Sequence, residues 1–288
     1  MKTRNERDFE KADKRDKPFL TVACVVFALY TASLIFPFVW MFINSFKDKT
    51  DFFVNPMALP KAGAICFENY SVIFETYNLG EMFLNSFILC ICIPTLAVFA
   101  TCSVAHGVAN HSFKLNKAMY TLALSVMFIP VAGSLATTFK LMYDTRLINT
   151  HIGVILLSSS GFGFNFLMLH SVYKGVSPTY AEAAKIDGAG YWRTFLQIVS
   201  PQVSPVIIAV WILSFIGVWN DYATPYLFLN GYPTLSVGVF LISEEAELHG
   251  DYPMLFAVIL VVTLPMIALF FAFQDKIMQM SMGGGIKE

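Results

Sequence analysis

Charge is scarce in this sequence, and the scarcity is unevenly spread. Only 14% of the 288 residues are charged and 56% are hydrophobic, whereas soluble domains carry about 25% charged residues. The stretches without any Asp, Glu, Lys or Arg are 18–46, 82–113, 118–139, 147–173, 194–220, 222–243 and 252–274. Each meets or approaches the roughly 20 apolar residues that cross a hydrocarbon core of about 30 Å. We therefore expect one all-α integral membrane domain.

Several kinds of site are missing as well. The formal net charge is −1, so no basic excess points to nucleic acid as a partner. The cysteines form no C-x-x-C pair and the histidines have no metal-ligand spacing, which argues against a disulfide framework or a zinc site. No G-x-x-x-x-G-K-S/T occurs, so the chain should not bind ATP through a P-loop. No nucleophile–base pair stands out. We expect no catalytic residue, no metal and no cofactor bound by this chain.

Proline and glycine reduce these stretches to six expected spans. The stretch 222–243 contains Pro225, Asn230-Gly231 and Pro233, which break helices and mark turns. We interpret it as the end of the fifth span followed by an irregular external segment. The first stretch lacks a clear small-residue cleavage site, so we expect a retained span there and not a signal peptide. The expected spans are 19–46, 82–109, 118–141, 151–173, 203–228 and 254–274.

The lysines and arginines set the expected orientation, because they resist translocation. With the N-terminus inside, 14 of the 19 Lys and Arg residues fall on the inner side. The outer side keeps Lys47, Lys49, Lys61, Lys140 and Arg146. Both termini are then cytoplasmic. The expected organisation is a charged cytoplasmic tail at 1–18, a transmembrane domain at 19–274 and a cytoplasmic tail at 275–288.

Residues 174–201 form the expected inner connection between the fourth and fifth spans. The first half of this segment carries the signals of a short helix. Thr179 and Glu182 have the spacing of a capping box, and Pro178 suits the entry to a helix. Residues 181–184 are rich in alanine, which favours helix with almost no side-chain bulk, so a partner's backbone can approach closely.

The second half predicts a tight turn and a further helix. Gly188 suits the left-handed position that ends a helix, and 191–199 resumes a helical pattern before Pro201. Glu182 and Asp187 offer charge for pairing. From these signals alone, the segment is a cytoplasmic helix–turn–helix. It either docks a soluble partner or lies on the membrane as an ordinary amphipathic connector.

The same segment resembles the EAA coupling loop of permease subunits from binding-protein-dependent ABC importers. In that pattern a Glu-Ala-Ala triplet precedes a Gly, an Ile and a Pro at fixed spacing. The positions in register here are Glu182, Ala183, Ala184, Gly188, Ile198 and Pro201. Asp187 and Ala189 beside the glycine are typical too, whereas Ser200 stands where the pattern usually has Leu.

Other features resemble the carbohydrate branch of this family, the maltose-permease-like group. They are Asn44-Ser45-Phe46-Lys47, Asn85-Ser86-Phe87, Trp219-Asn220-Asp221-Tyr222 and the tail 283–287. The resemblance covers nearly all of the chain after residue 18. It implies a subunit of a bacterial inner (plasma) membrane that forms half of the translocation pathway for a sugar or oligosaccharide.

The resemblance also implies the partners. A second homologous permease subunit would complete the pathway, and a dimer of P-loop ATPase subunits would bind ATP. An extracytoplasmic solute-binding protein would deliver the solute, and membrane lipid would surround the spans. This chain would be a non-catalytic subunit. Its ATPase-coupling residues would be Glu182, Ala183, Ala184, Asp187, Gly188 and Ala189.

Asp221 is the candidate for lining the solute pathway, because it is the only charged residue between 194 and 243. Intramembrane carboxylates are expensive and usually face a cavity or a partner. Trp219, Asn220 and Tyr222 surround it, and aromatic faces beside amide and carboxylate groups suit the ring and hydroxyls of a sugar. The alternative is an interfacial aromatic belt with a snorkelling aspartate.

Two functional alternatives stay open. The permease could carry a solute other than a sugar. A self-sufficient secondary transporter is the other alternative, although Asp221 is its only candidate coupling carboxylate and no internal repeat is evident. The absence of a nucleophile–base pair or metal cluster disfavours a membrane-embedded enzyme.

Overall fold

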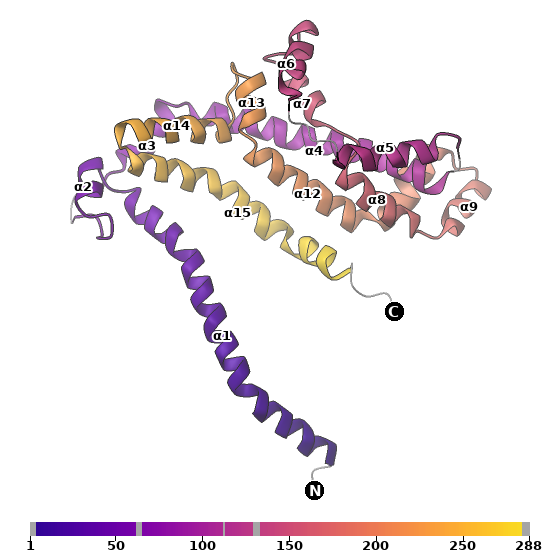
Figure 1. Cartoon of the computed structure of the whole chain (residues 1–288), viewed down its shortest axis with the longest axis horizontal. Helices are drawn as coiled ribbons and strands as arrows, with labels where there is room; N and C mark the ends of the chain where they lie inside the picture. The colour runs from indigo at the N-terminus through magenta and orange to yellow at the C-terminus, as the bar shows by residue number, and fades with distance from the viewer. Residues whose placement is uncertain (1–3, 62–64, 112, 129–132, 284–288) are drawn as a thin grey trace. The chain divides into compact units, whose positions relative to one another are not determined.

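The computed structural model describes residues 4–61, 65–111, 113–128 and 133–283, with side chains from 19 to 274. All of its regular elements are helices (Figure 1). They are α1 (Arg4–Asn44), α2 (Lys49–Val54), α3 (Glu68–Glu75), α4 (Leu79–Asn110), α5 (Asn116–Phe128), α6 (Leu135–Asp144), α7 (His151–Ser158), α8 (Phe164–Lys174), α9 (Pro178–Ile186), α10 (Tyr191–Arg193), the π-helix η1 (Thr194–Val199), α11 (Ser200–Gln202), α12 (Ser204–Asn220), α13 (Ala223–Phe228), α14 (Leu235–His249) and α15 (Tyr252–Gly283).

The chain divides into two compact units. The first contains residues up to Ile73 together with Ser243–Val261, and the second contains Phe74–Ile242 together with the residues from Val262 onward. The segment predicted to couple and the residues predicted to line a pathway all belong to the second unit. That unit is therefore the one that bears on function.

The core of the second unit forms where α4 packs against α8 and α12 (Figure 1). On α4, Val98, Cys102 and Ala105 are buried at a spacing of three to four residues, which places them on one face of the helix. Phe166 and Leu169 of α8 meet this face and are completely buried. The other face of α4 is apolar and exposed, including Phe99, which is what a helix needs when lipid surrounds it.

Among the described residues, three helical stretches are long and apolar enough to cross a membrane: Phe19–Asn44, Leu79–Asn110 and Tyr252–Gln274. A fourth candidate is the pair Tyr191–Gln202 and Ser204–Asn220, which is bent by 86° at Val203. These stretches agree with the first, second and sixth expected spans and with the core of the fifth. The count of six remains a prediction.

The two middle expected spans are interrupted. In the stretch 118–141, α5 ends at Phe128 and α6 begins at Leu135, and residues 129–132 lie outside the described part. In the stretch 151–173, α7 ends at Ser158 and α8 begins at Phe164. Gly163 has a positive φ of 108°, which a residue with a side chain rarely adopts, so the break there has a local cause.

The irregular external segment expected after the fifth span is wrong from Leu235 onward, where α14 begins. Helix α13 (Ala223–Phe228) lies within the expected fifth span 203–228. Pro233 does break the chain, but α14 starts two residues later, where its first amide and the Pro233 carbonyl both find partners on α4. The Leu235 amide donates to Ser86 Oγ at 2.8 Å, and Asn85 Nδ2 donates to the Pro233 carbonyl at 3.1 Å. Such contacts between segments far apart in the sequence cannot be read from local composition.

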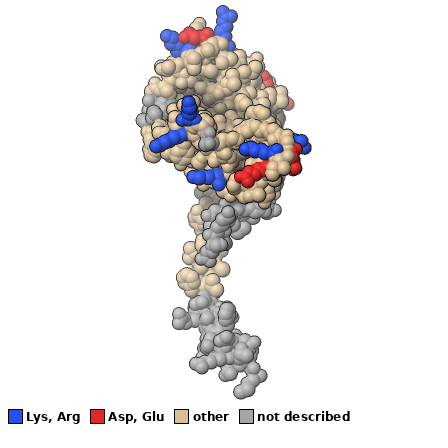
Figure 2. Space-filling view, turned by 90° about the vertical axis from the view of Figure 1, so that its right-hand side faces the viewer, with Lys and Arg blue, Asp and Glu red and all other residues tan. Residues whose placement is uncertain are grey.

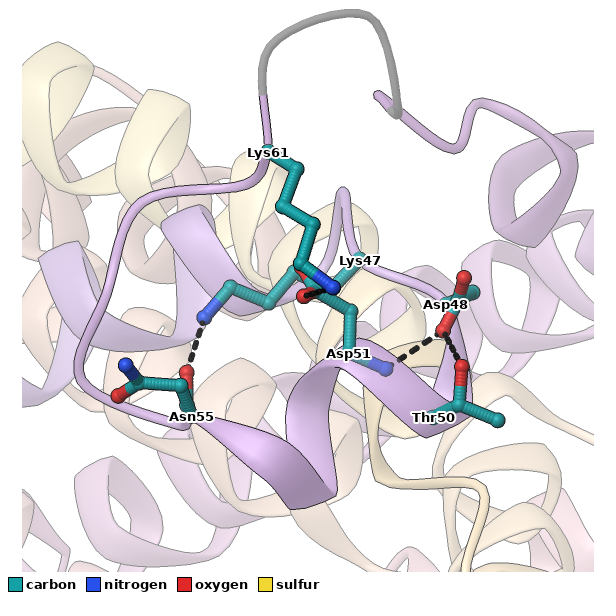
Figure 3. Close-up of polar contacts among 6 residues, drawn as sticks. All are labelled: Lys47, Asp48, Thr50, Asp51, Asn55 and Lys61. Carbon is teal, nitrogen blue, oxygen red and sulfur yellow. Dashed lines mark hydrogen bonds and ion pairs between the residues drawn. The ribbon is translucent and has the colours of Figure 1, made fainter.

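In the first unit, the segment after α1 folds around a buried lysine (Figure 3). Lys47 is fully buried and its ammonium donates to the Asn55 carbonyl at 2.9 Å. Burial lowers the pKa of Lys47, and the nearby Asp51 carboxylate opposes that shift. Lys61 pairs with Asp51 at 3.4 Å. At least one lysine expected on the outer side is therefore part of the fold and not a free surface charge.

Helix α2 begins at a side-chain cap in the same segment (Figure 3). The Asp48 carboxylate accepts hydrogen bonds from Thr50 Oγ1 and from the Asp51 amide, both at 2.7 Å. These bonds stabilise the ionised carboxylate and lower the pKa of Asp48. The cap satisfies an amide that the six-residue helix cannot satisfy itself.

Candidate functional site

Helix α9 carries the Glu-Ala-Ala triplet, and its N-cap lies two residues before the predicted cap at Thr179. Ser177 is the N-cap, Pro178 is the first helical residue, and no side-chain cap bond forms. Ser177 Oγ instead donates to Thr179 Oγ1 at 3.0 Å. The capping box of Thr179 and Glu182 is therefore wrong. The physical reason is Pro178, whose fixed φ and missing N–H suit the first helical position and place the cap just before it.

The end of α9 is closed by its own backbone, as Gly188 predicted. Gly188 has a φ of 75° and its amide donates to the Lys185 carbonyl at 3.1 Å. The Ala189 amide donates to the Ala184 carbonyl at 2.9 Å. This pair of bonds is the Schellman motif, which satisfies terminal carbonyls without using any side chain. The predicted left-handed position at Gly188 is confirmed.

The turn leaves one face of α9 free. Ala184 is buried at 3% exposure where α9 packs on η1, whereas Glu182, Ala183 and Asp187 are exposed. Ile186 is 87% exposed, the highest exposure among the large hydrophobic side chains described. An exposed apolar side chain with two exposed carboxylates close to it in the sequence has the composition of a docking surface.

Behind α9 lies a small cavity next to an aromatic cluster. The cavity has a volume of about 140 Å³. It is lined by His106, Asn110, His111, Ala181, Lys185, Ala189, Tyr191 and Thr194. The Tyr191 hydroxyl lies 3.4 Å from His106 Nδ1, and the Tyr191 and His111 rings are 5.1 Å apart. These contacts of Tyr191 connect α10, which follows α9, to the end of α4.

Ser200, the departure from the family pattern, has a specific partner. Its Oγ lies 3.0 Å from the hydroxyl of Tyr173, which is completely buried in the core. Sequence reasoning missed this pair. The signal was a polar residue at an apolar position of the pattern, which a partner elsewhere in the chain had to satisfy.

The residues predicted to line a pathway do not act as one group. Trp219 is only 6% exposed and packs against Phe87 and Phe215, at ring distances of 5.8 and 6.0 Å. The Asn220 side chain donates to the Ile216 carbonyl of its own helix at 2.8 Å. Asp221 accepts a hydrogen bond from the Thr224 amide at 3.0 Å, at the start of α13.

Tyr222 is the member of this group with an open ring. It is 45% exposed and stacks on Phe240 at 4.8 Å with an interplanar angle of 19°. Tyr226, which is 42% exposed, meets the same Phe240 edge-on at 5.4 Å. We call Tyr222, Tyr226 and Phe240 the aromatic face. Sequence reasoning missed the last two because they lie in separate helices, α13 and α14, that only the fold brings together.

Metal ligation has no candidate in the part of the chain that the structure describes. No group of three or more His, Cys, Asp or Glu side chains is placed to hold an ion. The five cysteines are free thiols.

Residues 79–279 match the family described as "binding-protein-dependent transport system inner membrane component". The diacetylchitobiose uptake system permease protein NgcG of Streptomyces coelicolor is 29% identical over 269 residues, which cover 92% of this chain and 88% of that protein. The melibiose/raffinose/stachyose import permease protein MelC of Bacillus subtilis is 27% identical and covers 93% of this chain and 97% of its own length.

The fold is shared with a solved structure. A crystal structure of a bacterial ABC transporter involved in the import of the acidic polysaccharide alginate contains a chain that superposes with a TM-score of 0.74. The match covers 91% of this chain and 97% of that chain at 17% identity, so it bears on the fold alone. Transport systems of this family work with a binding protein and an ATPase. Because the family match spans well over half of the sequence, the chain belongs to the binding-protein-dependent transport system inner membrane components, as a multi-pass, non-catalytic permease subunit of the bacterial inner membrane.

Proposed function

We propose that this subunit forms half of the translocation pathway for a sugar or oligosaccharide, and that α9 couples it to a separate ATPase. The carbohydrate class is supported by the names of the relatives, two of which import diacetylchitobiose and the melibiose/raffinose/stachyose group. A second homologous permease subunit completes the pathway. A pair of P-loop ATPase subunits binds the ATP, and an extracytoplasmic binding protein delivers the solute.

The observation that carries the coupling role is the exposed face of α9. Ile186 extends almost fully into solvent while Ala184 anchors the helix from below. Ile186 is the most exposed large hydrophobic side chain described, and central apolar anchors contribute most of the affinity of an interface. Glu182 and Asp187 flank this anchor and supply the charge that orients the partner.

The proposed topology places this face in the cytoplasm. Six spans with both termini inside put the coupling segment 174–201 between the fourth and fifth spans. The excess of Lys and Arg on that side supports the orientation. The bend of 86° at Val203 supports a segment that runs along the inner surface before the chain enters the membrane.

We assign contact with the solute to the aromatic face. Tyr222 and Tyr226 offer exposed rings with hydroxyls at their edges, which match the apolar ring faces and hydroxyl rim of a sugar. Asn220 and Asp221 remain neighbours of this face, although their side chains already bond within the chain. Trp219 is buried against Phe87 and Phe215, so we assign it no contact with the solute.

The experiment is copurification from membranes in mild detergent, with the tagged wild-type chain and an Ile186→Asp variant compared side by side. Mass spectrometry of the wild type should find a second permease and a P-loop ATPase, and the variant should lose the ATPase alone. The complex is then reconstituted with its binding protein and assayed with labelled oligosaccharides and with amino acids. ATP-dependent uptake of a sugar supports the proposal. Uptake of a different solute class overturns the substrate, and uptake abolished by a protonophore at constant ATP overturns the ATPase coupling.

A further inference from the structure

A second, larger cavity lies at the start of the coupling segment 174–201, of which it includes only Lys174. Its volume is about 610 Å³. It is lined by residues from the end of α4, the connection to α5, the start of α5 and the end of α8: Val108, Ala109, Phe113, Lys114, Asn116, Lys117, Tyr120, His170 and Lys174. Three lysines face one cavity here, and its lining contains no Asp or Glu.

The three lysines concentrate positive charge without compensation nearby. Lys114, Lys117 and Lys174 are exposed, and none of them has a carboxylate partner among the described residues. Figure 2 faces the part of the protein that carries α5, α8 and α9, and it shows blue side chains without red neighbours on one part of the surface. Like charges that converge on one cavity repel each other, so an anion there relieves the repulsion.

Beside the lysines, one part of the lining is apolar and continues into the core. Val108 is buried in the core cluster, and Ala109 packs against that cluster. The Tyr120 ring lies 5.0 Å from the His170 ring, and both contact the buried Phe166. A soluble phosphate needs only the lysines, whereas an amphiphile needs an apolar wall directly beside them.

The lysines also stand where two apolar stretches reach their first charge. After Lys117 no charged residue occurs until Lys140, and before Lys174 none occurs back to Arg146. Side chains at such a boundary lie at the depth of lipid headgroups, where lysine contributes about 1 kcal/mol of attraction to an anionic surface.

We propose that this cavity binds the headgroup of an anionic phospholipid of the cytoplasmic leaflet. The phosphate lies among Lys114, Lys117 and Lys174, and the glycerol and upper acyl chain lie on Val108, Ala109 and Tyr120. The inference rests on the proposed topology, which places these lysines inside.

The test is native mass spectrometry of the assembled transporter, stripped of lipid and then titrated with phosphatidylglycerol, phosphatidylcholine or inorganic phosphate. Wild type should bind phosphatidylglycerol at least tenfold more tightly than phosphatidylcholine, and inorganic phosphate at the same concentration should not displace it. The variant Lys114→Gln/Lys117→Gln/Lys174→Gln should lose roughly a hundredfold in affinity, about fivefold per lysine. The matching Lys→Arg triple variant should keep the affinity.

The control is Lys61→Gln/Lys140→Gln/Arg146→Gln, which removes the same charge from the opposite predicted side and should bind as wild type does. Single Lys→Gln variants, each expected to lose about fivefold, serve if the triple variant does not assemble. Equal losses in test and control variants, or displacement by inorganic phosphate, overturn the proposal. So does loss of the ATPase with unchanged lipid binding, because the lysines then serve a protein partner. Absence of the ATPase from the wild-type spectra contradicts the proposed function instead.

Discussion

Two turns of this protein each carry an aspartate and differ in how they satisfy the backbone. Asp187 lies in the turn after α9 and Asp221 in the turn after α12. After α9, the amides of Gly188 and Ala189 bond to carbonyls of the helix itself. After α12, the Asp221 amide bonds to the Val218 carbonyl, and the side chains of Asn220 and Asp221 form further bonds within the chain. The first turn leaves its side chains free for a partner, whereas the second uses them internally.

The difference shows how to decide which polar side chains of a membrane protein are available to a partner. A charge in an apolar stretch must be stabilised, but a partner within the chain can do so as well as a ligand or a second protein. The glycine at position 188 is what frees Glu182 and Asp187, since it allows the backbone to close the helix without help. Counting the bonds that each side chain already makes therefore separates a docking surface from a structural turn.

The largest expected effect comes from Gly188→Val. A left-handed backbone costs a residue with a side chain about 1–2 kcal/mol, and a β-branched residue is worse. The substitution should open the turn, remove the ATPase from the purified complex and lower uptake at least about tenfold, while the subunit still inserts. Gly190→Ala is the control, because Gly190 has an ordinary φ of −72° and an added Cβ meets nothing within 4 Å. Normal uptake by Gly188→Val would contradict the coupling role of the turn.

A smaller effect is expected from Ile186→Asp. The side chain is almost fully exposed, so the substitution should leave stability unchanged and weaken ATPase binding on the order of tenfold, as the loss of an apolar anchor does. The measurement is a titration of purified ATPase against the detergent-solubilised permease. Leu248→Asp is the matched control, since Leu248 is 80% exposed and lies on α14. If both variants bind the ATPase equally well, α9 is not the docking face.

The pair Tyr173 and Ser200 should affect stability and not docking. Ser200→Ala or Tyr173→Phe each removes their hydrogen bond, at a cost of about 1 kcal/mol. The double variant should cost little more than either single one, because the same bond is lost only once. Thermal unfolding in detergent measures all three. Fully additive losses would show that the two hydroxyls act independently.

The smallest effect is expected at Asp221. Asn keeps an oxygen that can accept from the Thr224 amide, so Asp221→Asn should leave uptake within about twofold of wild type. Asp221→Ala removes the acceptor and should cost about 1 kcal/mol of stability. A tenfold loss of uptake in Asp221→Asn would show that the carboxylate charge itself serves transport, and it would erase the contrast between the two turns.

The sequence was sufficient to predict those features that depend only on neighbouring residues. The apolar lengths of α4 and α15 were enough to predict spans, and Gly188 was enough to predict the left-handed turn. Errors arose where a choice lay between neighbouring signals or depended on distant contacts. Pro178 outweighed the capping box of Thr179 at the start of α9.

Distant contacts explain the remaining differences. Helix α14 begins where Ser86 of α4 accepts its first amide, and the aromatic face brings together rings from α13 and α14 beside Tyr222. Neither arrangement leaves a periodic mark in the sequence. The composition of the cavity with three lysines was likewise visible only once the ends of α4, α5 and α8 were brought together.

The near-perpendicular bend at Val203 gives the second unit an L-shaped pair of helical arms, with the form of a crank. Helix α12 has 17 residues, so its length is about 25 Å, and a tilt of about 5° at its foot displaces its far end by about 2 Å. The short arm of the crank is α10–α11, next to α9, and the long arm ends at Asn220, beside Tyr222. The two arms, Tyr191–Gln202 and Ser204–Asn220, are of comparable length, so a displacement at the short arm would reach the aromatic rings at about the same size.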